Sequence, residues 1–347
     1  MAHASGRDMS SEKAAPEGWE SKEPLVSVSC ITFNHGPYLR QALESFVNQK
    51  TSFPIEVLIH DDCSTDDTIE IIQEYAERYP EMIRPMFEEQ NQYSQGISNI
   101  SGVFNFPRAR GKYIAMCEGD DFWSDMEKLE KQAQYMEAHP ECAMCCHSAG
   151  VVSMDDAFRT VSVLQPFSGS RVLAAEEVIS KKENIPTASL MFRTEYAKTL
   201  PQYYYDCPVG DIPLHLYMAS RGTVYYFDEV MSMYRMGGAG SWGSSMDSEQ
   251  AKQKWEKHYQ EMQALFGAFD ASTDGKYAQA VQEALNRSRF LIDLKEEKIS
   301  AVLEAKNKKF LDELPDTEKR LLLLRAKHPG IYEIIRKIYY KLRSSVA

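Results

Sequence analysis

Residues 112–123 read Lys-Tyr-Ile-Ala-Met-Cys-Glu-Gly-Asp-Asp-Phe-Trp, an apolar run that ends in closely spaced carboxylates. The apolar part predicts a buried strand, and the acids Glu118, Asp120 and Asp121 follow it directly. Carboxylates so close together repel one another, and a divalent cation is the simplest means of holding them in one place. This stretch therefore predicts a metal site at the end of a strand.

A second pair of acids ends another apolar run. Asp61 and Asp62 follow Ile55-Glu-Val-Leu-Ile-His60, which also has the pattern of a buried strand. Open α/β sheets bind ligands at the edge where the carboxyl ends of their strands meet. The two acid clusters together predict a metal and nucleotide site on the rim of one sheet.

Strand-like and helix-like segments alternate from residue 25 to residue 150. The expected strands are 25–32, 55–60, 82–87 and 112–117, and the expected helices are 38–48, 64–75 and 124–138. This alternation is typical of an α/β fold with a mostly parallel sheet covered by helices. Beyond it the pattern predicts helices at 174–182 and 212–221, strands at 188–192 and 223–227, and an almost wholly helical segment from residue 249.

The composition narrows the class of protein. The chain has 347 residues and a formal net charge of -12, which argues against nucleic-acid binding over the whole surface. No run of eighteen apolar residues predicts a spanning helix. Residues 1–23 are polar and read as a disordered leader, not as a secretory signal. Seven cysteines without such a signal favour a reducing compartment, so a cytoplasmic location is expected.

Three of the cysteines are close together in the sequence. Cys142, Cys145 and Cys146 could form a soft-metal cluster, but no second pair with zinc-ligand spacing accompanies them. The segment Cys142-Ala-Met-Cys-Cys-His147 also has the pattern of a buried strand. Buried thiols are the preferred interpretation.

Glycine-rich phosphate loops are missing from the sequence. The first expected strand is not followed by a Gly-x-Gly-x-x-Gly turn, and Gly111-Lys112 lacks the hydroxyl residue and the preceding glycine of a Walker loop. Phosphates are therefore expected to be held through a metal and not by a glycine cradle.

Three segments in order resemble the successive motifs of family 2 glycosyltransferases. They are Val26-Ser-Val-Ser-Cys-Ile-Thr-Phe-Asn34, Asp61-Asp-Cys-Ser-Thr-Asp66 and Arg110-Gly-Lys-Tyr-Ile-Ala-Met-Cys-Glu-Gly-Asp-Asp-Phe-Trp123. The resemblance implies a GT-A-type, Rossmann-like sheet, mostly parallel and flanked by helices. It places a catalytic domain at 24–245 and a helical C-terminal extension at 246–347.

The resemblance also implies a site for a nucleoside-diphosphate sugar. The expected contacts of the donor nucleotide are Thr32, Phe33, Asn34, Asp61, Asp62, Glu118, Asp120 and Arg235. Asp120 and Asp121 are the expected ligands of Mn²⁺ or Mg²⁺, which would neutralise the diphosphate. Many relatives have Asp-x-Asp-Asp where this chain has Glu-Gly-Asp-Asp, so Glu118 ranks below the two aspartates as a metal ligand.

A general base is expected on the acceptor side. Val209-Gly-Asp-Ile-Pro-Leu214 resembles the family's acid at the start of a helix below the acceptor, which makes Asp211 the candidate. The alternative is that Asp211 only caps the helix, a role compatible with Pro213 just inside it. One base without a second nucleophile fits a single displacement, and the resemblance implies inversion at the sugar carbon.

The segment Tyr234-Arg235-Met-Gly-Gly-Ala-Gly-Ser-Trp242 resembles the loop that closes over the donor in relatives. Arg235 would pair with the diphosphate, and Trp242 would cover the sugar. Trp123 is also assigned to the donor and acceptor loop. An ordinary surface loop is the alternative. The chain lacks the Gln-x-x-Arg-Trp element of processive members, so non-processive transfer of one or a few sugars is expected.

Residues 321–347 are basic and amphipathic in a chain that is otherwise acidic. Six cations oppose a single acid, Glu333, and isoleucines fall on one helical face. The cations are Arg325, Lys327, Arg336, Lys337, Lys341 and Arg343. Such a helix could lie on the cytoplasmic face of an anionic membrane, or pack on protein within the chain or in a homodimer. Both interpretations stay open.

The sequence thus predicts a metal-dependent glycosyltransferase. It would move a sugar from a UDP-, GDP- or dTDP-sugar to a hydroxyl of a glycan or lipid-linked acceptor in polysaccharide or lipid-linked glycan assembly. The alternative is a catalytically silent nucleotide-binding or scaffold protein of the same fold. A nucleotidyltransferase would require a glycine-rich triphosphate loop near the N-terminus, which is not found.

Overall fold

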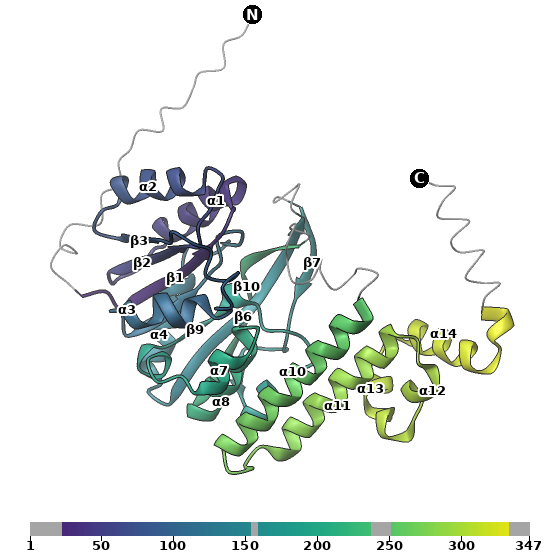
Figure 1. Ribbon diagram of the computed structural model, residues 1–347. Coiled ribbons are helices and arrows are strands. Elements are labelled where there is room, and N and C mark those ends of the chain that lie inside the picture. Colours follow the sequence, from purple (N-terminus) through teal and green to yellow (C-terminus); the bar gives the residue numbers. More distant parts are fainter. Residues whose placement is uncertain (1–22, 154–158, 237–250, 333–347) are drawn as a thin grey trace, which may run out of the picture. The chain divides into compact units, whose positions relative to one another are not determined.

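The computed structural model describes residues 23–153, 159–236 and 251–332 (Figure 1). The chain divides into two compact units, residues 1–239 and residues 240–347. The first unit contains every strand that the structure describes, and the described part of the second unit is helical. The expected site residues all fall in the first unit except Trp242, which lies outside the described residues.

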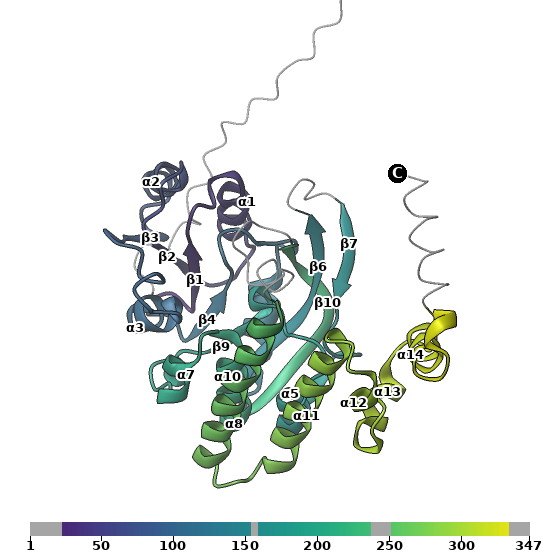
Figure 2. The same cartoon turned by 45° about the vertical axis from the view of Figure 1, so that its right-hand side comes forward.

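The first unit is built on a ten-stranded sheet with the order β3-β2-β1-β4-β9-β6-β10-β5, with β7 beside β6 and β8 beside β10. The strands are β1 (Val26–Thr32), β2 (Ile55–Asp61), β3 (Ile83–Phe87), β4 (Tyr113–Met116), β5 (Phe122–Trp123), β6 (Cys142–Ser153), β7 (Thr160–Leu164), β8 (Arg171–Leu173), β9 (Met191–Arg193) and β10 (Thr223–Met236). β1 to β4 pair in parallel, whereas β9 is antiparallel to both of its neighbours. Figure 2 shows the long β6 and β10 side by side, with β7 at the edge.

Helices cover both faces of this sheet. They are α1 (Gly36–Val47), α2 (Thr68–Arg78), α3 (Phe106–Arg108), α4 (Lys128–Ala138), α5 (Ala175–Ile179), α6 (Thr194–Ala197), α7 (Gln202–Asp206) and α8 (Asp211–Arg221). One apolar core joins α1, α2 and α4 to alternate residues of the central strands. A second core joins α3, α5 and α8 to residues that point to the opposite face. β1, β2 and β4 are buried on both sides, which explains their nearly continuous apolar runs.

The expected strands of the N-terminal half lie within about one residue of the observed ones. The expected helix at 124–138 begins only at Lys128, with Glu127 as its N-cap. Phe122 and Trp123 instead form β5, which pairs antiparallel with β10 and holds the segment before α4 in the sheet. Cys142, Cys145 and Cys146 lie in β6 with no exposed surface, as the buried-strand interpretation predicts.

Gly111 lies where the chain enters β4 and presses against β1. A Cβ at this position would stand 2.6 Å from the backbone nitrogen of Ser27 and 2.8 Å from the carbonyl carbon of Val26. These are backbone atoms of a buried strand, and they cannot move aside without disturbing the pairing of that strand.

We therefore expect Gly111→Ala to lower the free energy of unfolding by about 1–3 kcal/mol, the usual cost of overpacking. Urea denaturation measures this change. Gly267 of α10 is the control, because a Cβ there meets nothing within 4 Å and alanine favours a helix. An unchanged urea midpoint for Gly111→Ala would contradict the close approach of β1 to this glycine.

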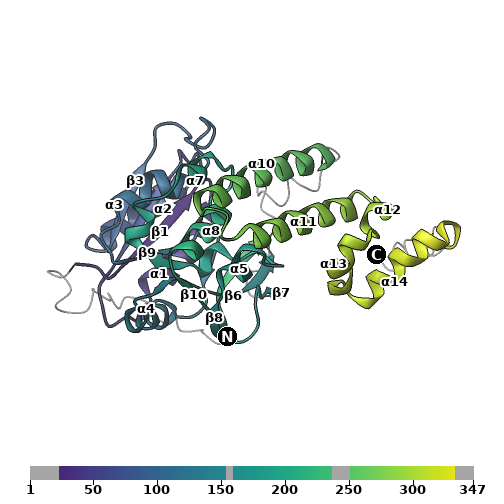
Figure 3. The ribbon, with the colours of Figure 1, turned by 90° about the horizontal axis from the view of Figure 1, so that it is seen from below.

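The second unit consists of helices in its described part (Figure 3). They are α10 (Ala251–Ser272), α11 (Ala278–Lys295), α12 (Ile299–Val302), α13 (Lys308–Glu313) and α14 (Asp316–Lys327). α10 and α11 pack side by side, and a small core of Phe290, Val302 and Phe310 joins α11 to the shorter helices. Within the described residues, no helix is both long and apolar enough to cross a bilayer.

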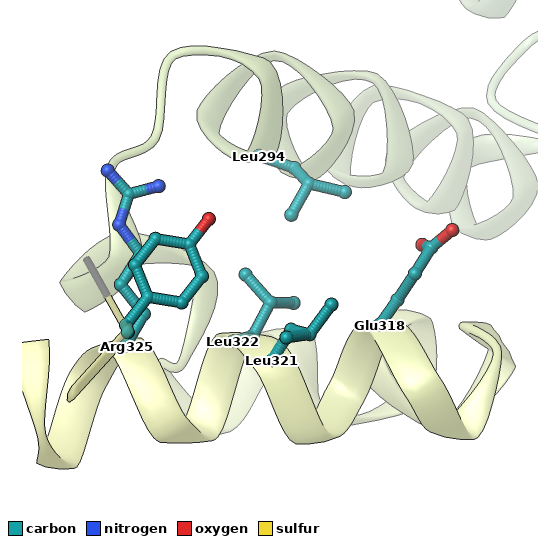
Figure 4. Close-up of a pocket in the computed structure, with 6 residues that line it drawn as sticks. Leu294, Glu318, Leu321, Leu322 and Arg325 are labelled. Carbon is teal, nitrogen blue, oxygen red and sulfur yellow. The ribbon is translucent and has the colours of Figure 1, made fainter. Parts of the chain in front are cut away.

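The start of the predicted amphipathic tail lines a pocket of this second unit. Leu321, Leu322 and Arg325 of α14 face Leu294 of α11 across it, with Glu318 at one end (Figure 4). The tail is described only as far as residue 332, and the remainder of 321–347 lies outside the described residues. Membrane contact through this segment therefore stays a prediction.

Candidate active site

The predicted site residues gather where β1, β2 and β4 end. The register places Thr32 of β1 opposite Asp61 of β2. The acid segment that follows β4 runs on beside β1, because Gly119 donates its N–H to the carbonyl of Ile31 at 2.9 Å. Both acid clusters predicted from the sequence are thus at one edge of one sheet.

Gly119 makes this approach sterically feasible. A Cβ at residue 119 would lie 2.7 Å from Oγ1 and 2.9 Å from Cβ of Thr32, and 3.0 Å from Nδ1 of His35. The absence of a side chain lets the acid segment pack directly against the end of β1. The glycine between Glu118 and Asp120 therefore has a packing role.

Asp61 and Asp62 shape the loops around the expected nucleotide pocket. Asp61 is fully buried and accepts both the N–H and the hydroxyl of Ser64, at 3.0 and 2.5 Å. Asp62 accepts the N–H groups of Gln92 and Tyr93, at 2.6 and 3.1 Å, one on each carboxylate oxygen. Both aspartates thus hold loop backbone in place, which is an organising role that the sequence did not reveal.

Asn34 joins the first motif to the second. Its backbone is left-handed, with φ of 53°, and its side-chain oxygen accepts the N–H of Thr65 at 2.7 Å. Thr32 is buried, and its hydroxyl has no hydrogen-bond partner among the described residues. Phe33 lies between them with 43% of its surface exposed. Of the three, Phe33 presents the largest surface for a ligand.

The three acids after β4 are crowded and poorly solvated. Burial, then the charges of Asp120 and Asp211, raise the pKa of Glu118 to about 8. Burial, then the charges of Asp120 and Glu118, raise the pKa of Asp121 well above its usual value. Asp120 is partly exposed, and Nε2 of His35 lies 3.9 Å from its Oδ2. The charge of Arg235 opposes the rise in the pKa of Asp121.

These acids fit a divalent cation by their chemistry. They offer hard oxygen donors, and their mutual repulsion would be relieved by a positive charge. Within the described part of the chain, no group of three or more His, Cys, Asp or Glu side chains forms a ready metal cage. Mg²⁺ commonly takes only one or two carboxylates and completes its shell with substrate phosphates and water. Asp120 and Asp121 would suffice for such an open site.

Arg235 comes to the site from β10 but is largely enclosed. Its backbone N–H donates to Asp121 Oδ1 at 2.8 Å, and its guanidinium donates to the side-chain oxygen of Gln41. The guanidinium also lies over the rings of Tyr38 and Phe122, 5.0 and 5.1 Å from their centres. Arg235 therefore supports Asp121 from the protein side. Its expected pairing with the diphosphate stays a prediction.

The expectation for Trp123 is corrected by the structure. The ring was expected in the donor and acceptor loop, but it is 4% exposed and belongs to the core. Its indole N–H donates to the carbonyl of Ala188 at 3.0 Å, and the buried ammonium of Lys128 lies 4.3 Å from the centre of the ring. The pairing of β5 with β10 places this residue in the sheet, so its side chain points into the core.

Asp211 is the first residue of α8, and its Oδ1 accepts the N–H of Ile212 at 2.8 Å. The capping role that the sequence left open is not observed, because Gly210 is the N-cap of α8 and no side chain caps the helix. Asp211 also acts electrostatically on Glu118 and on Tyr234 of β10. The structure thus brings the candidate base into the same site as the acids after β4.

Two residues near Asp211 were not predicted from the sequence as part of the site. Burial lowers the pKa of Lys181, which follows α5, and the charge of Asp211 opposes this change. His215 lies one helical turn beyond Asp211 on α8. The spacing of four residues could have indicated His215. Nothing local distinguishes Lys181 from its neighbour Lys182.

The family model described as glycosyl transferase family 2 matches residues 27–198, which include both acid clusters. Residues 27–198 thus belong to this family. The GT-A-type α/β fold expected from the motifs is also confirmed, because solved structures of this type align with nearly the whole chain.

Proteins similar to this chain come from several microorganisms. An uncharacterized protein of Mycobacterium tuberculosis strain H37Rv is 37% identical over 225 residues, which are 63% of this chain and 61% of that protein. The chain thus spans about three fifths of that relative's length. The putative teichuronic acid biosynthesis glycosyltransferase TuaG of Bacillus subtilis is 37% identical over 115 residues, 33% of this chain and 42% of TuaG.

Two solved structures share the fold of this chain. TarS of S. aureus, residues 1–349 in complex with UDP-GlcNAc, has a TM-score of 0.58 at 18% identity and covers 91% of each chain. The mannosyltransferase PcManGT of Pyrobaculum calidifontis, in complex with GDP-Man and Mn²⁺, has a TM-score of 0.51 at 15% identity. The match covers 94% of this chain and 87% of that one.

Proposed function

We propose that this glycosyltransferase moves a sugar from a nucleoside-diphosphate donor to a hydroxyl group of an acceptor, with a divalent metal and with inversion at the sugar carbon. The observation that carries the proposal is that the acids after β4 meet the ends of β1 and β2, where Gly119 donates its N–H to Ile31 and Thr32 lies opposite Asp61. Asp120, from the expected donor motif, and Asp211, the candidate base, both contribute to the raised pKa of Glu118. Donor and acceptor chemistry would therefore meet at one point.

The donor would lie along the edge formed by β1, β2 and β4. The exposed ring of Phe33 is suited to stack on a base, and the loop held by Asp62 would form the adjoining wall. Asp120 and Asp121 would hold Mn²⁺ or Mg²⁺, which as a Lewis acid neutralises the charge that develops on the leaving diphosphate. The mannosyltransferase PcManGT is in complex with GDP-Man and Mn²⁺, which supports a nucleotide-sugar donor and a divalent metal for this chain.

Asp211 would act on the acceptor. As the acceptor oxygen forms its bond to the anomeric carbon, the hydroxyl proton passes to the Asp211 carboxylate. The bond from that carbon to the phosphate oxygen breaks at the same time, and its electron pair leaves with the nucleoside diphosphate. A single displacement of this kind inverts the configuration. Phe33 and Asp120 would bind the donor, whereas Asp211 would take the proton of the acceptor. Because these residues come from different segments, a substitution at one of them should affect only one of the two steps.

The proposed class of acceptor rests on the reaction expected at this site and on the name of one similar protein. A hydroxyl of a glycan or a lipid-linked glycan fits the predicted reaction, and the name of the partly aligned Bacillus relative points to a cell-surface polysaccharide. We propose that the protein works in the cytoplasm, where nucleotide sugars are available to it, with peripheral membrane contact if residues 321–347 bind lipid.

A donor screen tests this function directly. We expect the full chain with Mn²⁺ to hydrolyse one of UDP-, GDP- or dTDP-sugars slowly without acceptor, and excess chelator to abolish the release of nucleoside diphosphate. Nucleotide release, followed by coupled assay or chromatography, is the readout. If nucleoside diphosphate is released at the same rate with excess chelator, the reaction does not require a metal. Binding of a donor without any turnover would favour the silent scaffold.

A further inference from the structure

The loop that precedes Asp211 is attached to a distant segment of the chain through one asparagine. Asn99 is 4% exposed, and its Nδ2 donates to the carbonyl of Tyr204 at 2.5 Å and to that of Cys207 at 2.8 Å. The hydroxyl of Ser98 donates to the same carbonyl of Cys207 at 3.0 Å. Because carbonyl oxygens only accept hydrogen bonds, the NH₂ end of the amide must face this loop. These contacts therefore fix the orientation of the Asn99 side chain.

The oxygen of the same amide lies against the residue before Asp211. Oδ1 of Asn99 has no hydrogen-bond partner among the described residues, and a Cβ at Gly210 would stand 2.7 Å from it. Gly210 is the N-cap of α8, and Asp211 is the first residue of that helix. Three residues after Asn99, Gly102 packs on the ring of Tyr204, since a Cβ there would lie 2.8 Å from the phenol oxygen. The segment around Asn99 thus contacts the loop at both of its ends.

This segment is itself attached to the sheet edge assigned to the donor. Before Asn99, the Asp62 carboxylate holds the backbone of the loop that leads to it. After Asn99, the fully buried Asn105 donates from Nδ2 to the carbonyls of Cys30 in β1 and Leu58 in β2, at 3.1 and 3.3 Å. A short stretch of chain with anchors on both sides therefore connects the donor edge to the loop before α8.

The position of this loop matters for the proposed reaction. A general base must lie within hydrogen-bond reach of the proton that it takes. Without the Asn99 amide, the carbonyls of Tyr204 and Cys207 would lose a buried donor, and the loop would move to satisfy them. The start of α8 follows this loop directly, so the Asp211 carboxylate would move with it.

We propose that Asn99 is a positioning residue for the general base. It would hold the loop 204–210 in place relative to the donor edge, and thereby keep the Asp211 carboxylate within reach of the acceptor hydroxyl. The inference rests on the proposed role of Asp211 in the transfer reaction. It adds a buried residue that touches neither donor nor acceptor and works through the base.

Replacing Asn99 by alanine tests this role. We expect kcat of sugar transfer to fall about 10- to 100-fold, because a displacement of about 1 Å at the reacting groups can cost 100-fold. The donor KM should stay within about twofold, since other contacts hold the donor edge. Asn307→Ala is the matched control. Asn307 is 3% exposed and donates from Nδ2 to the carbonyl of Ala301 at 2.8 Å, but it lies in the second unit, so its loss should lower the urea midpoint and leave kcat unchanged.

Combination with Asp211→Asn distinguishes positioning of the base from a general structural effect. In the Asp211→Asn background, Asn99→Ala should lower the residual rate by less than about twofold, because no base remains to be misplaced. Gly210→Ala provides a second probe that keeps the Asn99 amide. Its Cβ would press on Oδ1 of Asn99, so kcat should again fall while the donor KM is retained.

Wild-type kcat in Asn99→Ala would overturn the inference, and so would an equal loss in the presence and absence of the Asp211 carboxylate. If Asn99→Ala does not fold, Gly210→Ala decides by the same two criteria. Asp211→Asn alone separates this failure from failure of the proposed function. If it transfers sugar at the wild-type rate, the base assignment itself is wrong. If it is inactive while Asn99→Ala and Gly210→Ala behave as wild type, only the Asn99 inference is wrong.

Discussion

Replacing Asp211 by asparagine should reduce the rate constant of sugar transfer by about 10²–10⁴-fold, the usual contribution of a positioned general base. Asparagine keeps the size of the side chain and an oxygen that can accept the N–H of Ile212, but it cannot take a proton. The donor KM should change little, because Asp211 acts on the acceptor. Initial rates with saturating donor measure the effect.

The same variant separates the two roles of Asp211 that the sequence left open. Asparagine is as good a residue as aspartate at a helix start, so the urea midpoint should stay near that of the wild type. Asp206→Asn on neighbouring α7 is the matched control, since Asp206 is exposed and only accepts a hydrogen bond from Gln202. A fully active Asp211→Asn protein would exclude Asp211 as the general base and leave it a structural role at the start of α8.

Replacing Asp120 by asparagine should have the second largest effect. We expect the affinity for the donor in the presence of Mn²⁺ to fall about 100-fold or more, because loss of even an outer-shell partner of a metal costs 10- to 100-fold. Asp120 is a better position than Asp121 at which to test metal binding. Asp121 is 3% exposed and accepts the N–H of Arg235, so its replacement would also disturb packing.

Calorimetric titration of the protein with donor and Mn²⁺ measures this change, and Glu127→Gln is the control. Glu127 is an exposed carboxylate six residues after Asp121, so its loss alters net charge without touching the acid cluster. Chelator should weaken donor binding to the wild type and leave Asp120→Asn almost unaffected. Equal affinity of Asp120→Asn and wild type for donor with Mn²⁺ would exclude a metal at this aspartate.

The central part of the fold could be predicted from sequence because its signals are local. β1, β2 and β4 are buried on both faces, so each appears as an apolar run, and the acids that end these runs mark the sheet edge. The parallel pairing then brings Asp61 and the acids after β4 together. The family and the fold were therefore accessible from three short segments.

What the sequence did not reveal depends on contacts between distant segments. Trp123 follows an acid motif as a loop residue would, yet pairing with β10 buries it. Lys181 and Lys182 are chemically identical, and only the fold makes the first half-buried and leaves the second exposed. Asp62 organises residues thirty positions later in the chain, where no pattern in the sequence points back to it.

The direct packing of Gly119 on Thr32 has a consequence for ligand selection. Gly119 packs on Thr32 and donates its N–H to Ile31, so the segment assigned to the phosphates is attached directly to the strand assigned to the nucleobase. The distance between the two binding regions is therefore set by the protein. We expect a nucleoside monophosphate to bind poorly because it is too short to reach both regions, and not because any contact repels it.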